Sequence, residues 1–185
     1  MTRFDRPGSA GRTALVGVLS AGGLAVLWMA CLTPSGRTGI TAAAGLFPVA
    51  AVLLAGRAAG WLCWAVIALL GLLLLPNKAV SLMFALFLGL YPVAKSRLEQ
   101  LRQRGLEWVL KLLLFNGAML LTYFVLLRFT TAIDPQEFTI AGVYLPGVVL
   151  AFGNVVFCVY DVALTRLVGL YLRVWQPRVR RWLHF

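Results

Sequence analysis

The side chains of this chain that could bind a solute stand in or beside short polar breaks between long apolar runs. One break is Pro76-Asn77-Lys78, which interrupts the apolar stretch from Leu69 to Lys95. A lysine there could form charge-assisted hydrogen bonds with an anionic or carbonyl-rich part of a solute. The same residues also suffice for a helical hairpin, because proline ends a helix and asparagine accepts turn conformations. The candidate substrate-binding residues are Arg37, Asn77, Lys78, Ser81, Tyr123, Arg128 and Glu137.

The motifs of common catalytic and metal-binding sites are absent from the sequence. It contains no GxSxG, no phosphate-binding P-loop and no HExxH motif. One histidine and three cysteines without a CxxC pair form no metal-binding pattern. We therefore expect no catalytic residue, no metal site, no cofactor and no ATP hydrolysis by this chain. The cysteines Cys31, Cys63 and Cys158 are expected to be small apolar fillers.

The composition indicates an integral membrane protein. Hydrophobic residues make up 61% of the 185 residues and the mean hydropathy is +0.88, whereas a soluble domain is about 45–50% apolar. Apolar runs of spanning length predict an all-α fold with six transmembrane helices. We expect a single membrane domain over 1–185 with a basic tail at 161–185. The expected spans are 13–32, 42–55, 58–75, 79–94, 108–127 and 139–160.

The basic residues predict the orientation of these spans. The net charge is +11, and because the charges flank apolar runs, they favour a membrane over a nucleic-acid partner. With the N-terminus inside, all but three of the 17 Lys and Arg residues lie in inner segments or reach them by snorkelling, as Lys111 would. The exceptions are Arg37, Lys78 and Arg128. Both termini are therefore expected in the cytoplasm, and Lys78 on the outer face.

Polar residues inside the expected helices have a structural and a functional interpretation. Asn116 and Asn154 are expected to hydrogen-bond across helices. Asp161 is expected to be solvated or paired with Arg166, although an acid this close to a span is also a functional candidate. The amphipathic segment 96–113 is expected to form an interfacial helix, in contact with lipid headgroups or a partner.

The first expected helix carries small residues four apart, at Gly17, Ala21 and Ala25. Such a face lets two helix backbones approach closely in lipid. It could pack inside this chain, or it could dock a partner subunit.

The segment 13–76 resembles the N-terminal half of the substrate-binding S components of energy-coupling factor (ECF) vitamin transporters. It reads TALVGVLSAGGLAVLWMACLTPSGRTGITAAAGLFPVAAVLLAGRAAGWLCWAVIALLGLLLLP. The shared pattern is an alanine-rich first helix, a long outer loop and a short second helix with a proline. An inner turn similar to GxxAG follows, at 56–60 here.

The resemblance implies a bacterial cytoplasmic membrane protein that takes up a vitamin-like small molecule. Its implied partners are a membrane coupling subunit with two ATPases, the substrate and membrane lipids, with no nucleic acid. Docking onto the coupling subunit would use Gly17, Ala21 and Ala25, with glycine in place of the family's first alanine. Two alternatives remain: a scaffold of the cell-wall elongation machinery, similar to rod-shape proteins of the MreD type, and an enzyme or lipid carrier with an unrecognised site.

Overall fold

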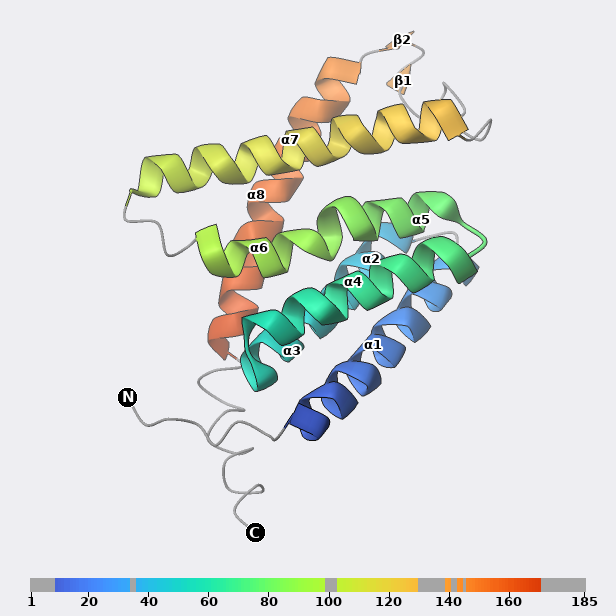
Figure 1. Cartoon of the computed structure of the whole chain (residues 1–185). Coiled ribbons are helices and arrows are strands. Elements are labelled where there is room, and N and C mark those ends of the chain that lie inside the picture. The colour runs from blue at the N-terminus through green and yellow to red at the C-terminus, as the bar shows by residue number, and fades with distance from the viewer. Residues whose placement is uncertain are drawn as a thin grey trace. The chain divides into compact units, whose positions relative to one another are not determined.

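A computed structural model describes residues 9–33, 36–98, 103–129, 139–140, 143–144 and 146–170 (Figure 1). The chain divides into two compact units, 1–133 and 134–185, and each is described by itself. The elements of the first unit are α1 (Ser9–Leu32), α2 (Arg37–Ala44), α3 (Leu46–Ala55), α4 (Arg57–Leu74), α5 (Lys78–Met83), the π-helix η1 (Phe84–Leu88), α6 (Leu90–Leu98) and α7 (Arg104–Phe129). Those of the second are β1 (Thr139–Ile140), β2 (Val143–Tyr144) and α8 (Pro146–Leu170).

The described residues contain six helical segments long and apolar enough to cross a membrane. They are Ala10–Leu32, Arg37–Ala55, Arg57–Leu74, Lys78–Leu98, Gly105–Thr122 and Leu150–Leu170. Many of their large apolar side chains are exposed, among them Leu69, Leu113 and Val159, as expected of helices whose outer surface meets lipid. The prediction of a helical, multi-pass membrane protein is confirmed, whereas its orientation and its single domain stay predictions.

The expected outer loop at 33–41 and the short second helix are wrong, because α2 already begins at Arg37. Gly36 precedes it with φ 81°, and the Thr41 hydroxyl donates to the Arg37 carbonyl oxygen at 2.8 Å within its first turn. α2 and α3 together form one span with a break at Gly45. Pro48 explains the break, because it has no N–H to donate to the carbonyl four residues earlier.

The expected inner turn over 56–60 is also shorter than predicted. Gly56 alone separates α3 from α4, with φ 95° and ψ 173°, a backbone conformation that glycine adopts without a steric cost. Gly60 lies in the first turn of α4, where a Cβ would collide with Val52 of α3. A single positive-φ residue and one close contact therefore replace the predicted five-residue turn.

The fourth span is not a continuous α-helix. It consists of α5, the π-helical turn η1 and α6, in which Gly89 N–H donates to the Phe84 carbonyl oxygen at 2.8 Å. α6 contains Pro92 and extends to Leu98, four residues beyond the expected end. The predicted interfacial helix over 96–113 is wrong, since α6 ends and α7 begins within that segment.

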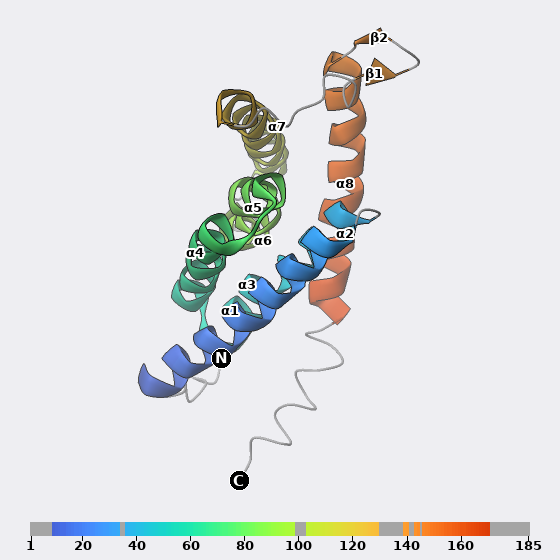
Figure 2. The same cartoon turned by 90° about the vertical axis from the view of Figure 1, so that its right-hand side faces the viewer.

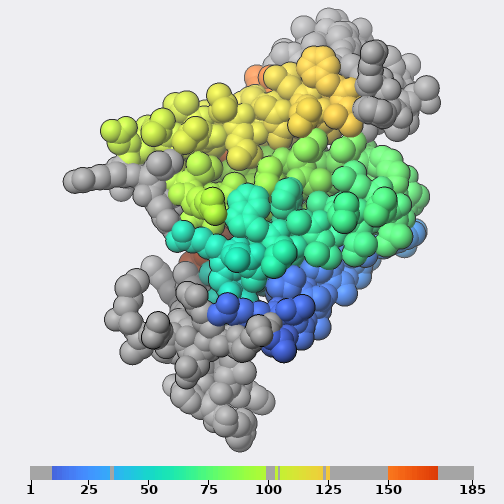
Figure 3. All heavy atoms as spheres, in the orientation of Figure 1, coloured from blue at the N-terminus to red at the C-terminus, as the bar shows by residue number. Residues whose placement is uncertain are grey.

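Within the first unit, α5–η1–α6 lies between α7 and α4, and α1 packs on the other side of α4 and on α3 (Figures 1 and 2). On the face drawn in Figure 3, α7, α6, α4 and α1 follow one another from top to bottom. The core between these helices contains Leu27, Ile67 and Phe84, each fully buried. Gly22 and Gly23 of α1 allow Phe47 and Ile67 to approach its backbone.

In the second unit, β1 and β2 pair antiparallel, with Thr139 opposite Tyr144. The sixth helix was expected to begin at 139, but α8 begins at Pro146. Proline favours the first helical position, where its missing N–H costs nothing. α8 then continues to Leu170, ten residues past the expected end of the span at Tyr160.

Candidate functional site

Three of the candidate substrate-binding residues meet at the α4–α5 turn. The Asn77 side chain accepts hydrogen bonds from the backbone N–H groups of Ala79 and Val80, at 3.0 and 3.2 Å, and so caps α5. The Ser81 hydroxyl is buried and donates to the Gly71 carbonyl oxygen of α4 at 2.9 Å. Both side chains therefore have a structural function in the hairpin.

Lys78 lies at the same turn with its side chain exposed. Its ammonium donates to the carbonyl oxygens of Leu72 and Leu75, at 2.8 and 3.0 Å. These carbonyls belong to the end of α4, where the helix dipole favours a cation. An ammonium has three donors, so one N–H of Lys78 is not used by these two bonds.

The other candidate residues do not join this turn in the described part of the chain. Arg37 is exposed at the first residue of α2, and α2 packs beside α5. The side chains of Tyr123 and Arg128, and the whole of Glu137, lie outside the described residues. The structure thus brings together Asn77, Lys78 and Ser81, with Arg37 on a neighbouring helix.

The three candidate docking residues lie on an exposed face of α1. Gly17, Ala21 and Ala25 are all exposed, and a Cβ added at Gly17 would meet nothing within 4 Å. The glycines that pack inside the unit are Gly22 and Gly23, on another face of the same helix. Internal packing therefore does not account for the stripe within the described residues.

The sequence analysis did not predict the buried charges at the end of α6 and in the first half of α7. Lys95 is 5% exposed and Lys111 is 2% exposed. Lys111 forms an ion pair with Glu107, one turn nearer the start of α7, at 2.7 Å, and its snorkelling toward the inner segment stays a prediction. The spacing of Glu107 and Lys111, four residues apart on one helix, was the available signal.

The packing of α6 against α7 places these charges in one band. Phe87 and Phe115 are in contact, with ring centroids 5.0 Å apart. α6 and α7 run in opposite directions, so residues that follow Phe87 lie level with residues that precede Phe115. This register puts Tyr91 at the level of Lys111 and Lys95 at the level of Glu107. A buried band of this kind can bind a counterion or hold two helices in register.

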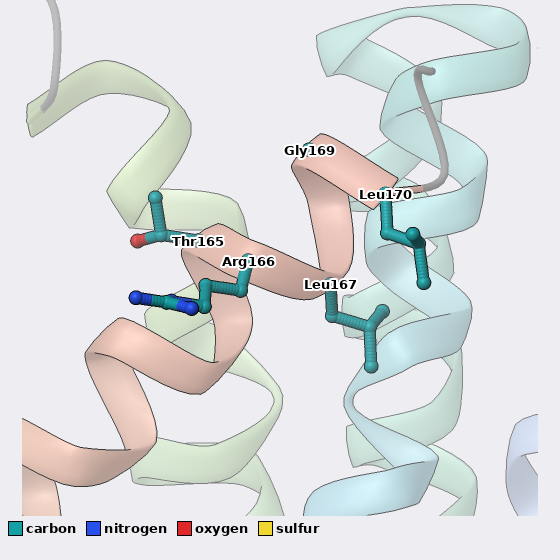
Figure 4. A pocket seen from close by; sticks show the side chains of 5 residues that line it. All are labelled: Thr165, Arg166, Leu167, Gly169 and Leu170. Atoms are coloured by element: carbon teal, nitrogen blue, oxygen red, sulfur yellow. The ribbon is translucent and has the colours of Figure 1, made fainter. Parts of the chain in front are cut away.

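α8 carries a buried acid and an open hollow. Asp161 is 4% exposed, whereas Arg166 is exposed, and the expected solvation or pairing of Asp161 stays a prediction. A hollow of about 750 Å³ is lined by Thr165, Arg166, Leu167, Gly169 and Leu170. The side chains of Thr165 and Arg166 point away from those of Leu167 and Leu170 (Figure 4). The polar and the apolar side chains that line the hollow therefore do not face a common point.

The amides inside the helices and the cysteines show no arrangement for chemistry. The side-chain N–H groups of Asn116 and Asn154 donate to carbonyl oxygens four residues earlier on their own helices, each at 2.8 Å. Cys31, Cys63 and Cys158 are free thiols, and Cys63 accepts a hydrogen bond from Ser20. Within the described ranges, no three residues of the His, Cys, Asp and Glu types are grouped to hold a metal ion.

Comparisons with protein-family models, with curated proteins and with solved structures give no significant match to this chain.

Proposed function

We propose that this chain is the membrane-embedded substrate-binding subunit of an ECF-type transporter, which takes up a vitamin-like small molecule with energy from a separate ATPase module. The observation that supports the proposal is the exposed small-residue face of α1. Gly17, Ala21 and Ala25 present little more than backbone to the surroundings. Helices associate in lipid through such faces, because close backbone approach provides the van der Waals attraction.

The solute would bind at the end of the first unit that carries the α4–α5 turn. Lys78 and Arg37 are exposed there, on helices that lie side by side. Two carbonyls of α4 hold the Lys78 ammonium in place and leave one N–H for a solute. An anionic or carbonyl-rich group fits two cations of this kind.

The docking step is tested with Ala21→Leu. The leucine side chain would hold the two backbones apart, so co-purification with the coupling subunit and uptake should be lost. The thermal unfolding temperature of the isolated subunit should stay unchanged, because position 21 is exposed. The matched control is Ala65→Leu, the same substitution at an exposed position of α4, which should leave co-purification intact. Unfolding of Ala21→Leu, or equal loss of partner in both variants, would refute docking through this face.

The second candidate function is a scaffold of the cell-wall elongation machinery, of the MreD type. It is favoured by the α4–α5 turn, where Asn77 and Ser81 already have structural hydrogen-bond partners. A scaffold would use the α1 face for a protein partner and bind no vitamin. A thermal-shift screen of vitamins against the purified protein separates the two: stabilisation by one compound supports the transporter subunit, and retained partner binding without any ligand supports the scaffold.

A further inference from the structure

Two arginines and a tryptophan form a cluster at the end of the first unit that carries the α3–α4 turn. Arg57 is the first residue of α4, and Trp61 follows four residues later on the same helix face. Arg97, in the last turn of α6, places its guanidinium 5.8 Å from the centre of a Trp61 ring. Arg57 and Arg97 are both exposed. We call Arg57, Trp61 and Arg97 the basic cluster.

The basic cluster contains a buried hydrogen-bond donor for which the described part of the chain provides no acceptor. The indole Nε1 of Trp61 is buried and has no hydrogen-bond partner among the described residues, and the same holds for Nε of Arg12. Ser20 contacts Cys63 and Gly23 contacts Ile67, so the parallel register of α1 and α4 puts Arg12 level with the start of α4. Buried donors without partners are rare in proteins, and both of these lie at the same end of the unit.

The surroundings of the basic cluster combine positive charge with an apolar surface. The described acidic residues are Glu107 and Asp161, and Glu107 is paired with Lys111. Along α4, next to Trp61, an exposed apolar stripe runs away from the cluster through Leu62, Val66, Leu69 and Leu73. A ligand that satisfies both parts has an anionic, acceptor-rich head and a long apolar chain.

We propose that the basic cluster binds the phosphate of an anionic phospholipid, with an acyl chain along the stripe of α4. The phosphate oxygens would accept from the exposed guanidinium groups of Arg57 and Arg97, and from the Trp61 indole N–H after the ring turns this buried group toward the surface. Arginine suits this group because its planar fork matches the geometry of a phosphate. The length of the apolar stripe favours a lipid over free phosphate, which would leave it uncovered.

The test is a titration of lipids into the full chain, purified in a neutral detergent, with thermal unfolding as the measurement. Phosphatidylglycerol should raise the unfolding temperature in a saturable way. Phosphatidylcholine, with no net charge, and inorganic phosphate, with no acyl chain, should have little effect. Equal stabilisation by phosphatidylcholine would refute recognition of the charge, and equal stabilisation by inorganic phosphate would refute a lipid as the ligand.

Two variants test the residues of the cluster. Trp61→Phe keeps an aromatic side chain near Arg97 but removes the indole N–H together with one ring, and Arg57→Gln changes an exposed side chain. Each should weaken the apparent affinity for phosphatidylglycerol about tenfold or more, because a hydrogen bond to a charged group is lost. The control is Arg37→Gln, an exposed arginine at the opposite end of the unit, which should titrate like the wild type. If Trp61→Phe unfolds, Arg57→Gln decides alone, and wild-type affinity in that variant overturns the proposal.

Discussion

The ammonium of Lys78 donates to the carbonyl oxygen of Leu72 at 2.8 Å, which places a side chain of α5 over the end of α4. A second bond, to the Leu75 carbonyl at 3.0 Å, makes Lys78 a cap of that helix. From the sequence, we expected Pro76 and Asn77 to be sufficient for this turn. Lys78 stabilises it as well, whether or not a solute binds beside it.

Lys78→Met should lower the free energy of unfolding by about 0.3–1 kcal/mol, the usual contribution of a cation at an exposed helix end. Lys78→Arg should retain most of the stability, because a guanidinium also donates to carbonyls. Thermal unfolding in low and high salt is the measurement, and the difference should shrink as salt screens the charge. Arg37→Met is the control for removing an exposed cation. If Lys78→Met matches the wild type at low salt, the cap contributes nothing.

Gly45→Ala should destabilise the protein by about 1–3 kcal/mol, the range for forcing extra volume into a packed site. A Cβ at position 45 would collide with the carbonyl oxygen of Leu88 in η1, and a backbone atom cannot move aside as a flexible side chain does. Gly39→Ala is the control, because nothing lies within 4 Å of its added Cβ. It should be neutral or slightly stabilising, since alanine favours a helix. Comparable destabilisation by both variants would contradict the close approach of Gly45 to η1.

Glu107→Gln should destabilise the protein by up to about 1.5–3 kcal/mol, because a neutral amide oxygen replaces the charged acceptor of the buried Lys111 ammonium. The double variant Glu107→Gln with Lys111→Met should be less destabilised than Glu107→Gln alone, since no buried cation is left without its acid. Thermal unfolding of the two variants and the wild type gives the comparison. A double variant that is less stable than Glu107→Gln would show that Lys111 stabilises the fold mainly through other contacts.

The inside-positive distribution of charge predicts which ends of the helices face the cytoplasm. In a background without cysteine, a probe cysteine at position 78 should react with a membrane-impermeant maleimide from outside. A cysteine at position 57 should react only after the membrane is opened. Position 57 begins α4 and position 78 follows the turn at the other end of α4, so the two positions lie at opposite ends of that helix. Labelling of position 57 in intact cells would reverse the predicted orientation.

The spans were predictable because the length of an apolar run is set by the membrane it must cross. The breaks within the second and fourth spans were not predicted from the sequence. The segment 33–41 has the composition of a loop, yet Thr41 hydrogen-bonds within the first turn of α2 and Gly36 supplies a positive φ before it. The π-turn η1 has one local sign, Pro92, which has no N–H to donate to the Leu88 carbonyl, but it also packs against distant residues, since a Cβ on Gly45 would collide with that carbonyl oxygen. The Trp64 indole N–H donates to the Ala85 carbonyl oxygen at 3.1 Å.

Of the candidate site, only the position of the α4–α5 turn could be predicted from the sequence, and the contacts of its side chains could not. Proline and asparagine identify the hairpin, but the destination of the Lys78 ammonium depends on where the carbonyls of α4 end. The same limit applies to α1. Its small residues were visible in the sequence, whereas their division into a packed face at Gly22 and Gly23 and an exposed face at Gly17 depends on the position of Phe47 and Ile67.

The π-helical turn η1 also sets the rotational position, around the helix axis, of the residues that follow it in the fourth span. A π-helical turn holds one residue more than an α-helical turn, so it acts as a one-residue insertion built into the fourth span. Without that residue, the rest of the span would be rotated by about 100° around its axis. Tyr91 and Lys95, which are now buried, would face elsewhere. Deleting a single residue from 84–88 should therefore disturb the protein as much as several core substitutions at once, although the span would still be long enough to cross a membrane.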